Sequence, residues 1–117
     1  MQKKTYNLSY LCKMMGDKGY LIREMIDDFL KQVPEDLLVL NASIIKIDYA
    51  TIKSVSHALR SSVSIMCISS AIPILQEIEN FGTAATCIEK VKILYEKLND
   101  ICKCVFKEME IQKHNYV

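Results

Sequence analysis

Apolar residues recur at helical spacing along nearly the whole chain, and this periodicity constrains the fold more than any other feature. It is clearest near the C-terminus, where steps of three and four residues alternate: Val91, Leu94, Leu98, Ile101 and Val105. Only 3 glycines and 2 prolines occur in 117 residues, which also favours helix. No stretch shows the strict alternation of a half-buried strand. The sequence therefore predicts an all-α fold.

Turn-forming and capping residues divide this pattern into several helices. Leu8, Leu11 and Met15 predict a short N-terminal helix, which the segment GDKG ends. Asp17 is the expected cap of the second helix, and Pro34 begins either a third helix or a kinked continuation of the second. Asp48 is the expected cap of the helix that carries His57. The following helix should start near Ser69, Ser70 and Pro73 and stop at Gly82, and Thr86 with Glu89 has the spacing of a capping box for the last helix.

Short connections between amphipathic helices favour antiparallel neighbours. We therefore expect one domain, residues 1–117, folded as an antiparallel up-and-down four-helix bundle with an additional short N-terminal helix. Half of the residues are hydrophobic, enough for a core without cross-links. The 5 cysteines are odd in number and form no C-x-x-C, so we expect reduced, apolar side chains and neither a disulfide framework nor a zinc site.

The charge balance excludes some kinds of partner. The chain carries 15 basic and 14 acidic residues, so it has no strong basic field for nucleic acid or an anionic membrane. Its N-terminal stretch MQKKTYNLSYL lacks the apolar region of a signal peptide. No apolar run approaches the roughly 18 residues that span a bilayer. We therefore expect a cytoplasmic monomer that binds neither nucleic acid nor membranes.

His57 is one of 2 histidines and lies in the stretch KSVSHALRSSVSIM. At about 100° per residue, the apolar side chains of this helix fall on the side opposite His57. These are Ile52, Val55, Leu59, Val63 and Met66. The outward face around His57 is basic and small, with no acid: Ala50, Lys53, Ser54, Arg60, Ser61 and Ser64. The wheel therefore predicts an exposed His57 that a partner can approach closely.

Three interpretations of this histidine compete. An incidental surface histidine usually lies among charges of both signs, unlike this one. A metal-binding bundle needs inward-facing His, Asp or Glu, and the apolar stripes contain none, so we expect no metal site. Neutral imidazole is a nucleophile near neutral pH, and Arg60 and Lys53 lie one turn away, where they can offset the charge of a transferred phosphoryl group. His57 is thus a candidate phosphoryl acceptor.

The segment SHALRSSVSIMCI resembles the H-x-L-K-G-S signature of histidine-containing phosphotransfer (HPt) domains. His57 matches the phosphorylated histidine, Leu59 the apolar position, Arg60 the lysine and Ser62 a small residue. The flanking segments GDKGYLIREMIDDFL and LQEIENFG are similar to those of the family as well. The resemblance covers about residues 6–110, nearly the whole chain.

The resemblance implies a phosphorelay intermediate. His57 would accept a phosphoryl group from a receiver-domain aspartate, of a response regulator or a hybrid sensor histidine kinase, and pass it to another receiver. Arg60 and Glu79 would assist, with Glu79 hydrogen-bonded to the ring from the following helix. The expected phosphate- and partner-binding residues are Lys53, Ser54, Ser61 and Ser64. No nucleotide-binding loop is present, so we expect a phosphoryl carrier without a cofactor of its own, not a self-sufficient kinase, with Mg²⁺ brought by the receiver.

Two positions depart from the family pattern. Ser61 and Cys67 replace glycines, one beside the histidine motif and one ten residues after His57. Larger residues there change how closely a partner can approach and how the chain turns after the helix. They motivate an alternative function, a non-catalytic helical adaptor that binds a receiver or kinase without phosphotransfer.

Overall fold

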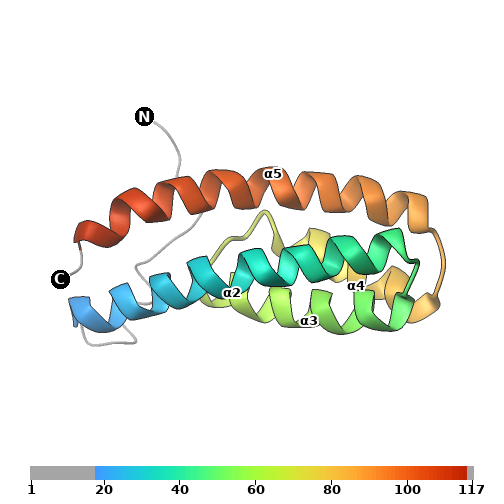
Figure 1. The fold of residues 1–117 in the computed structure, drawn as a ribbon, viewed down its shortest axis with the longest axis horizontal. Helices are drawn as coiled ribbons and strands as arrows, with labels where there is room; N and C mark the ends of the chain where they lie inside the picture. Colours follow the sequence, from blue (N-terminus) through green and yellow to red (C-terminus); the bar gives the residue numbers. More distant parts are fainter. Residues whose placement is uncertain (1–17, 116–117) are drawn as a thin grey trace.

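The computed structural model describes residues 18–115, which form four α-helices (Figure 1). These are α2 (Gly19–Ile45), α3 (Tyr49–Ile65), α4 (Ile72–Ala84) and α5 (Ile88–Gln112), and the single 3₁₀ turn η1 (Lys113–Asn115) follows α5. No strand occurs in this part of the chain, so the all-α prediction is confirmed. The predicted N-terminal helix at Leu8, Leu11 and Met15, and the predicted cap at Asp17, lie outside the described residues.

Successive helices run in opposite directions, joined by short connections (Figure 1). The helix α2 packs against α3 and α5, and α4 packs against the same two helices. The most extensive of these contacts joins α3 to α4. After the C-terminal end of α5, Lys113 Nζ lies 3.2 Å from Asp27 Oδ1, and this ion pair connects η1 to α2. The compact arrangement gives each helix two neighbours against which its apolar stripe is buried.

Most of the core comes from the predicted apolar stripes, although Leu94 and Ile101 of α5 are only partly buried. In α3, Ile52, Leu59 and Val63 are at most 1% exposed, and Met66 at its C-cap is 2% exposed. Val55 is partly buried against them. In α5, Val91, Leu98 and Val105 are fully or almost fully buried. Phe29 of α2 meets Phe106 of α5 edge to face, with ring centroids 6.1 Å apart. Each buried aliphatic or aromatic side chain contributes about 1.5–3 kcal/mol to folding, so burial is the main force that holds the helices together.

The helix α2 continues through Pro34 and does not restart there. The predicted third helix is therefore wrong, and the alternative of one continuous helix is correct. Proline in a helix interior removes a hydrogen bond and costs about 3 kcal/mol. Val33 and Leu37 on either side of it are buried in the core, and their burial offsets that cost.

Three helices end in the same hydrogen-bonded turn, each with a residue in the left-handed region. In α3, the Ile68 N–H donates to Val63 O and the Cys67 N–H to Ser64 O, the pattern of a Schellman motif. The left-handed residues are Ile47 (φ 55°), Cys67 (φ 54°) and Ala85 (φ 52°). Glycine is the residue best suited to this conformation, and none of the three is glycine. Cys67 therefore occupies a left-handed turn position directly after α3.

Two predicted boundaries differ from the structure. Gly82 does not stop α4, which runs on to Ala84, and Gly82 is buried within it. The helix α5 begins at Ile88, and its cap is Cys87 with φ 63° and no side-chain hydrogen bond. The predicted capping box of Thr86 and Glu89 is therefore wrong, because Cys87 occupies the cap position, whereas the Thr86 N–H donates to Phe81 O in the turn that ends α4.

Asp48 caps α3 as predicted. Its carboxylate accepts hydrogen bonds from the Thr51 N–H, at 3.2 Å, and from Thr51 Oγ1, at 2.6 Å. These two hydrogen bonds favour the ionised form and hold the pKa of Asp48 below its ordinary value. The same residue closes the turn after α2, because its N–H donates to Ser43 O. Asp48 thus fixes both the end of α2 and the start of the helix that carries His57.

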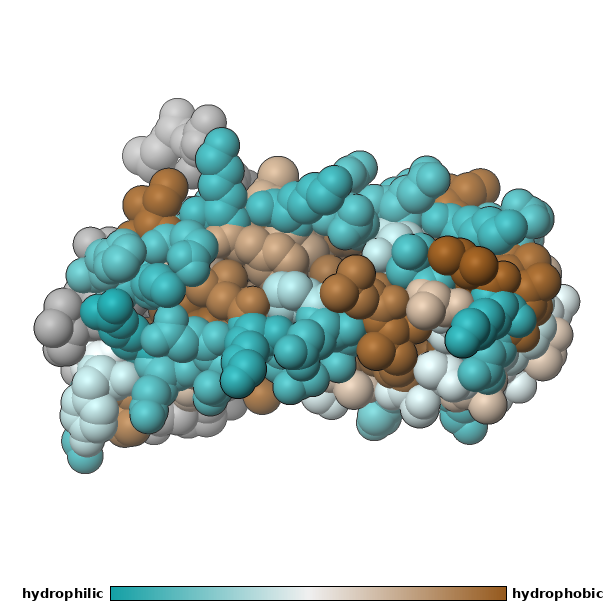
Figure 2. Space-filling model, viewed as in Figure 1, coloured by the Kyte–Doolittle hydropathy of each residue, from teal (hydrophilic) through white to brown (hydrophobic). Residues whose placement is uncertain are grey.

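The described cysteines are reduced, as the sequence predicts. Cys67, Cys87, Cys102 and Cys104 are free thiols, and burial raises the pKa of Cys102 to about 12. Hydrophilic residues cover most of the face in Figure 2, with separate apolar patches between them. Within residues 18–115, no helix is long and apolar enough to cross a membrane.

Replacing Ile47 by glycine is expected to stabilise the protein by about 1 kcal/mol, because a left-handed β-branched residue is strained. The side chain is 51% exposed, so its removal sacrifices little burial. Urea unfolding measures the change. The matched control is Ile93→Gly, at a 57% exposed position inside α5, which should lose stability. A loss of stability on Ile47→Gly would contradict the assignment of strain.

Replacing Asp48 by asparagine should remove one source of acid sensitivity. Asparagine also caps helices but does not titrate. Because the pKa of Asp48 is lowered in the folded protein, its contribution is present at neutral pH and is lost as the pH falls below about 4. The melting temperature of the parent should therefore drop relative to that of Asp48→Asn between pH 5 and pH 2. A difference that is constant with pH would refute this account.

Candidate functional site

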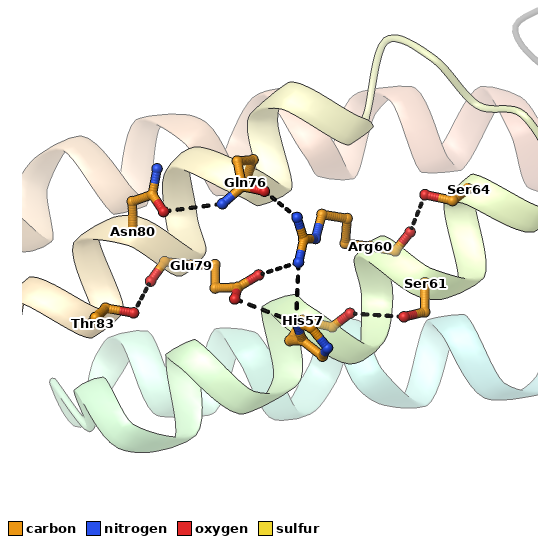
Figure 3. A network of polar contacts seen from close by, with 8 residues as sticks. All are labelled: His57, Arg60, Ser61, Ser64, Gln76, Glu79, Asn80 and Thr83. Atoms are coloured by element: carbon orange, nitrogen blue, oxygen red, sulfur yellow. Dashed lines mark hydrogen bonds and ion pairs between the residues drawn. The ribbon is translucent and has the colours of Figure 1, made fainter.

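The helix α3 presents His57 to solvent, as the helical wheel predicts. Its side chain is 61% exposed, whereas Leu59 on the opposite side of the helix is buried. The ring projects toward the neighbouring helix α4, which runs alongside α3 (Figure 3). His57 is thus open to a partner on one side and in contact with a second helix on the other.

The helix α4 brings a carboxylate to this ring. Glu79 Oε2 lies 3.3 Å from His57 Nδ1, although the two residues are 22 positions apart. Oε1 of the same carboxylate is buried and lies 3.2 Å from Arg60 Nη2. That second contact lacks the direction of a hydrogen bond and is an ion pair only. Glu79 therefore bridges the two residues of α3 that the sequence analysis places in the candidate site.

Both polar neighbours of His57 converge on the same ring nitrogen. Arg60 Nη2 lies 3.1 Å from Nδ1, in addition to the carboxylate of Glu79. A guanidinium can only donate a hydrogen bond and an ionised carboxylate can only accept one. Nδ1 therefore carries its proton when it pairs with Glu79 and lacks it when it accepts from Arg60. Among the described residues, none bonds to Nε2.

Arg60 is held by α4 as well as by its own helix. Its Nη1 donates to Gln76 Oε1, and Gln76 Nε2 donates in turn to Asn80 Oδ1 at 3.0 Å (Figure 3). The sequence analysis missed both Gln76 and Asn80. Their spacing was an available signal, because Gln76 precedes Glu79 by three residues and so shares its helix face. The guanidinium is thus fixed over the α3–α4 contact and does not extend freely into solvent.

The other predicted site residues surround His57 without touching its ring. Lys53 and Ser54 are exposed one turn before it, and Ser61 and Ser64 are exposed after it. The three serine hydroxyls donate to carbonyl oxygens of their own helix: Ser54 to Thr51, Ser61 to His57 and Ser64 to Arg60. The Lys53 ammonium has no acidic partner among the described residues. The surface around the imidazole is therefore made of small serine side chains and one exposed lysine.

Metal binding finds no support in this part of the chain. Within residues 18–115, no group of three or more His, Cys, Asp or Glu side chains is placed to hold a metal ion. The site consists of one imidazole, one carboxylate and one guanidinium with its amide neighbours. Such a set can hold a neutral imidazole in one tautomer and offset negative charge beside it.

Comparisons with models of protein families, with curated proteins and with solved structures gave no match.

The contact of Arg60 with Glu79 should be detectable as a coupling in unfolding experiments. The two side chains are only 29% and 16% exposed, so their mutual stabilisation is expected to be about 1 kcal/mol. A double-mutant cycle of Arg60→Ala and Glu79→Ala, followed by urea unfolding, measures this coupling. The pair Glu89 and Lys92, 80% and 49% exposed, is the control and should show much weaker coupling. Strictly additive effects of the two site mutations would exclude the interaction.

Proposed function

We propose that this protein is a phosphorelay intermediate that carries a phosphoryl group on His57. One observation supports this most directly: the imidazole, 61% exposed, has Nδ1 beside a carboxylate and a guanidinium, while no described residue bonds to Nε2. An incidental surface histidine has no need of partners from a second helix. The resemblance of the sequence to HPt domains points to the same chemistry.

The proposed transfer uses the tautomer in which Nδ1 carries the proton and donates to Glu79. Nε2 then has its lone pair free and attacks the phosphorus of an aspartyl phosphate. The N–P bond forms as the bond between phosphorus and the aspartate oxygen breaks, and the aspartate leaves as a carboxylate. The ring becomes positively charged, and the Glu79 carboxylate at Nδ1 stabilises that charge. Transfer to a second receiver aspartate reverses these steps.

The charge of the transferred group requires compensation. In the described geometry the Arg60 guanidinium contacts both Nδ1 and Glu79, so it already lies next to the reacting ring. We propose that it turns toward the phosphoryl oxygens once the partner is docked, together with the exposed Lys53. Mg²⁺ would come with the receiver domain. The receiver docks against the small side chains of Ser54, Ser61 and Ser64, which leave it room to approach the ring.

The proposal includes the finer details of the fold. The four described helices would constitute an antiparallel up-and-down bundle, and the predicted N-terminal helix would add a short fifth one. The whole chain would act as one domain, as a cytoplasmic monomer. The contacts of α2 and α4 with both α3 and α5 support the bundle part of this proposal.

Phosphoryl transfer from a receiver domain with a radiolabelled aspartyl phosphate should label the protein on His57. The label should be acid-labile, as phosphohistidine is, and should be absent from His57→Gln. The matched control is His114→Gln, which changes the other histidine, exposed in η1, and should label like the parent. Glu79→Ala and Arg60→Ala should each slow labelling roughly tenfold or more, because each removes a charged partner of the reacting ring.

The same experiment separates phosphotransfer from the adaptor alternative. Ser61 and the left-handed Cys67 favour an adaptor, and so does the engagement of Arg60 with Gln76. An adaptor would bind the receiver with the affinity of the parent after His57→Ala and would never carry label. Labelling that persists in His57→Gln, or no labelling by any receiver that binds, would refute the relay.

A further inference from the structure

Gly82 lies within the α-helix α4, and a helical backbone conformation does not require glycine. Gly82 is also buried. Any residue can adopt the helical conformation, and glycine is among the least favourable choices for it because of its conformational entropy. The reason for glycine must therefore be sought in the space around it.

That space is occupied by the backbone of α3. A Cβ atom at position 82 would lie 2.9 Å from Lys53 N, 3.1 Å from Lys53 Cα and 3.2 Å from Lys53 Cβ. The first distance is shorter than real Cβ contacts, and the two nearest atoms are backbone atoms within a helix. Such atoms move only if the helix moves. Any side chain at position 82 would therefore push α3 and α4 apart at this point.

The point of closest approach lies one helical turn from the candidate site. Gly82 follows Glu79 by three residues, and Lys53 precedes His57 by four. The contact between Glu79 Oε2 and His57 Nδ1, which crosses from α4 to α3 in Figure 3, is already 3.3 Å long. Hydrogen bonds from N–H to oxygen usually span about 2.7–3.2 Å. A further separation of a few tenths of an ångström would break this contact.

We propose that Gly82 is a positioning residue for the candidate site: its missing side chain sets the spacing of α3 and α4 at which Glu79 reaches His57 Nδ1. The carboxylate holds the proton on Nδ1 only at this spacing, which leaves Nε2 free as the nucleophile. The consequence for phosphoryl transfer rests on the proposed function, whereas the effect on the tautomer of His57 does not.

The test is the exchange Gly82→Ala, which adds one methyl group and removes no functional group. The ¹⁵N chemical shifts of the imidazole report the fraction of His57 with the proton on Nδ1, and that fraction should fall. Reaction with phosphoramidate, in which Nε2 attacks phosphorus and ammonia leaves, should slow roughly tenfold, since small misplacements of reacting groups have effects of this size. Gly19→Ala, the same exchange at the first residue of α2, is the control and should change neither quantity.

A second variant shows whether Gly82 acts through Glu79. In a Glu79→Ala background, Gly82→Ala should cause no further change in the His57 shifts or in the phosphoramidate rate. A general disturbance of the fold would instead add to the effect of Glu79→Ala. Additive effects would overturn the proposal, and so would a folded Gly82→Ala protein with the parent's shifts and rate.

Two other results would also be informative: a Gly82→Ala protein that does not fold, and a parent protein that does not react. If Gly82→Ala does not fold alone, it is measured in the Ile47→Gly background. Unfolding there as well would overturn the proposal, because the clearance would then serve the whole fold and not the contact of Glu79 with His57. If the parent reacts with neither phosphoramidate nor a receiver, the proposed function fails, but the ¹⁵N shifts still decide the role of Gly82.

Discussion

The close contact of α3 with α4 is the interaction on which the candidate site depends. His57 and Arg60 belong to one helix, and Glu79 and Gln76 to the other. Near these contacts the two backbones meet at Gly82 and Lys53, where there is no room for a Cβ atom. Helix axes are typically about 8–10 Å apart, depending on the side chains at the contact, and glycine at this contact permits a close approach of the two helices.

Two polar contacts meet at Nδ1 of the imidazole, one from Glu79 across this interface and one from Arg60 of the same helix. Glu79 and Arg60 both address Nδ1, and they demand opposite protonation of it. The two contacts in the described geometry therefore favour different tautomers of His57. A partner with negative charge that draws the guanidinium outward would leave Nδ1 to Glu79 and make Nε2 nucleophilic. Under the proposed function, docking of such a partner would also favour the tautomer in which the Nε2 lone pair is free.

Much of this could be predicted from local rules. The exposed position of His57 follows from 100° steps along a helix whose opposite side is apolar, because burial of that side fixes the rotation of the helix. Asp48 was predictable as a cap, because an acidic side chain at that position can satisfy free backbone N–H groups. Pro34 was not decided by local rules, because its local penalty competes with the burial of Val33 and Leu37.

The sequence by itself determined the helical class, the apolar stripes and the basic, acid-free side of α3 around His57. These depend on the order of residues within one helix, where spacing alone fixes which side chains lie together. The family resemblance already suggested Glu79 as a partner of the ring, but only the tertiary structure gave its distance of 3.3 Å and brought Gln76 to Arg60 and Gly82 against the backbone of Lys53. Contacts between helices depend on their separation and rotation to within a fraction of an ångström, and packing of the whole core sets both.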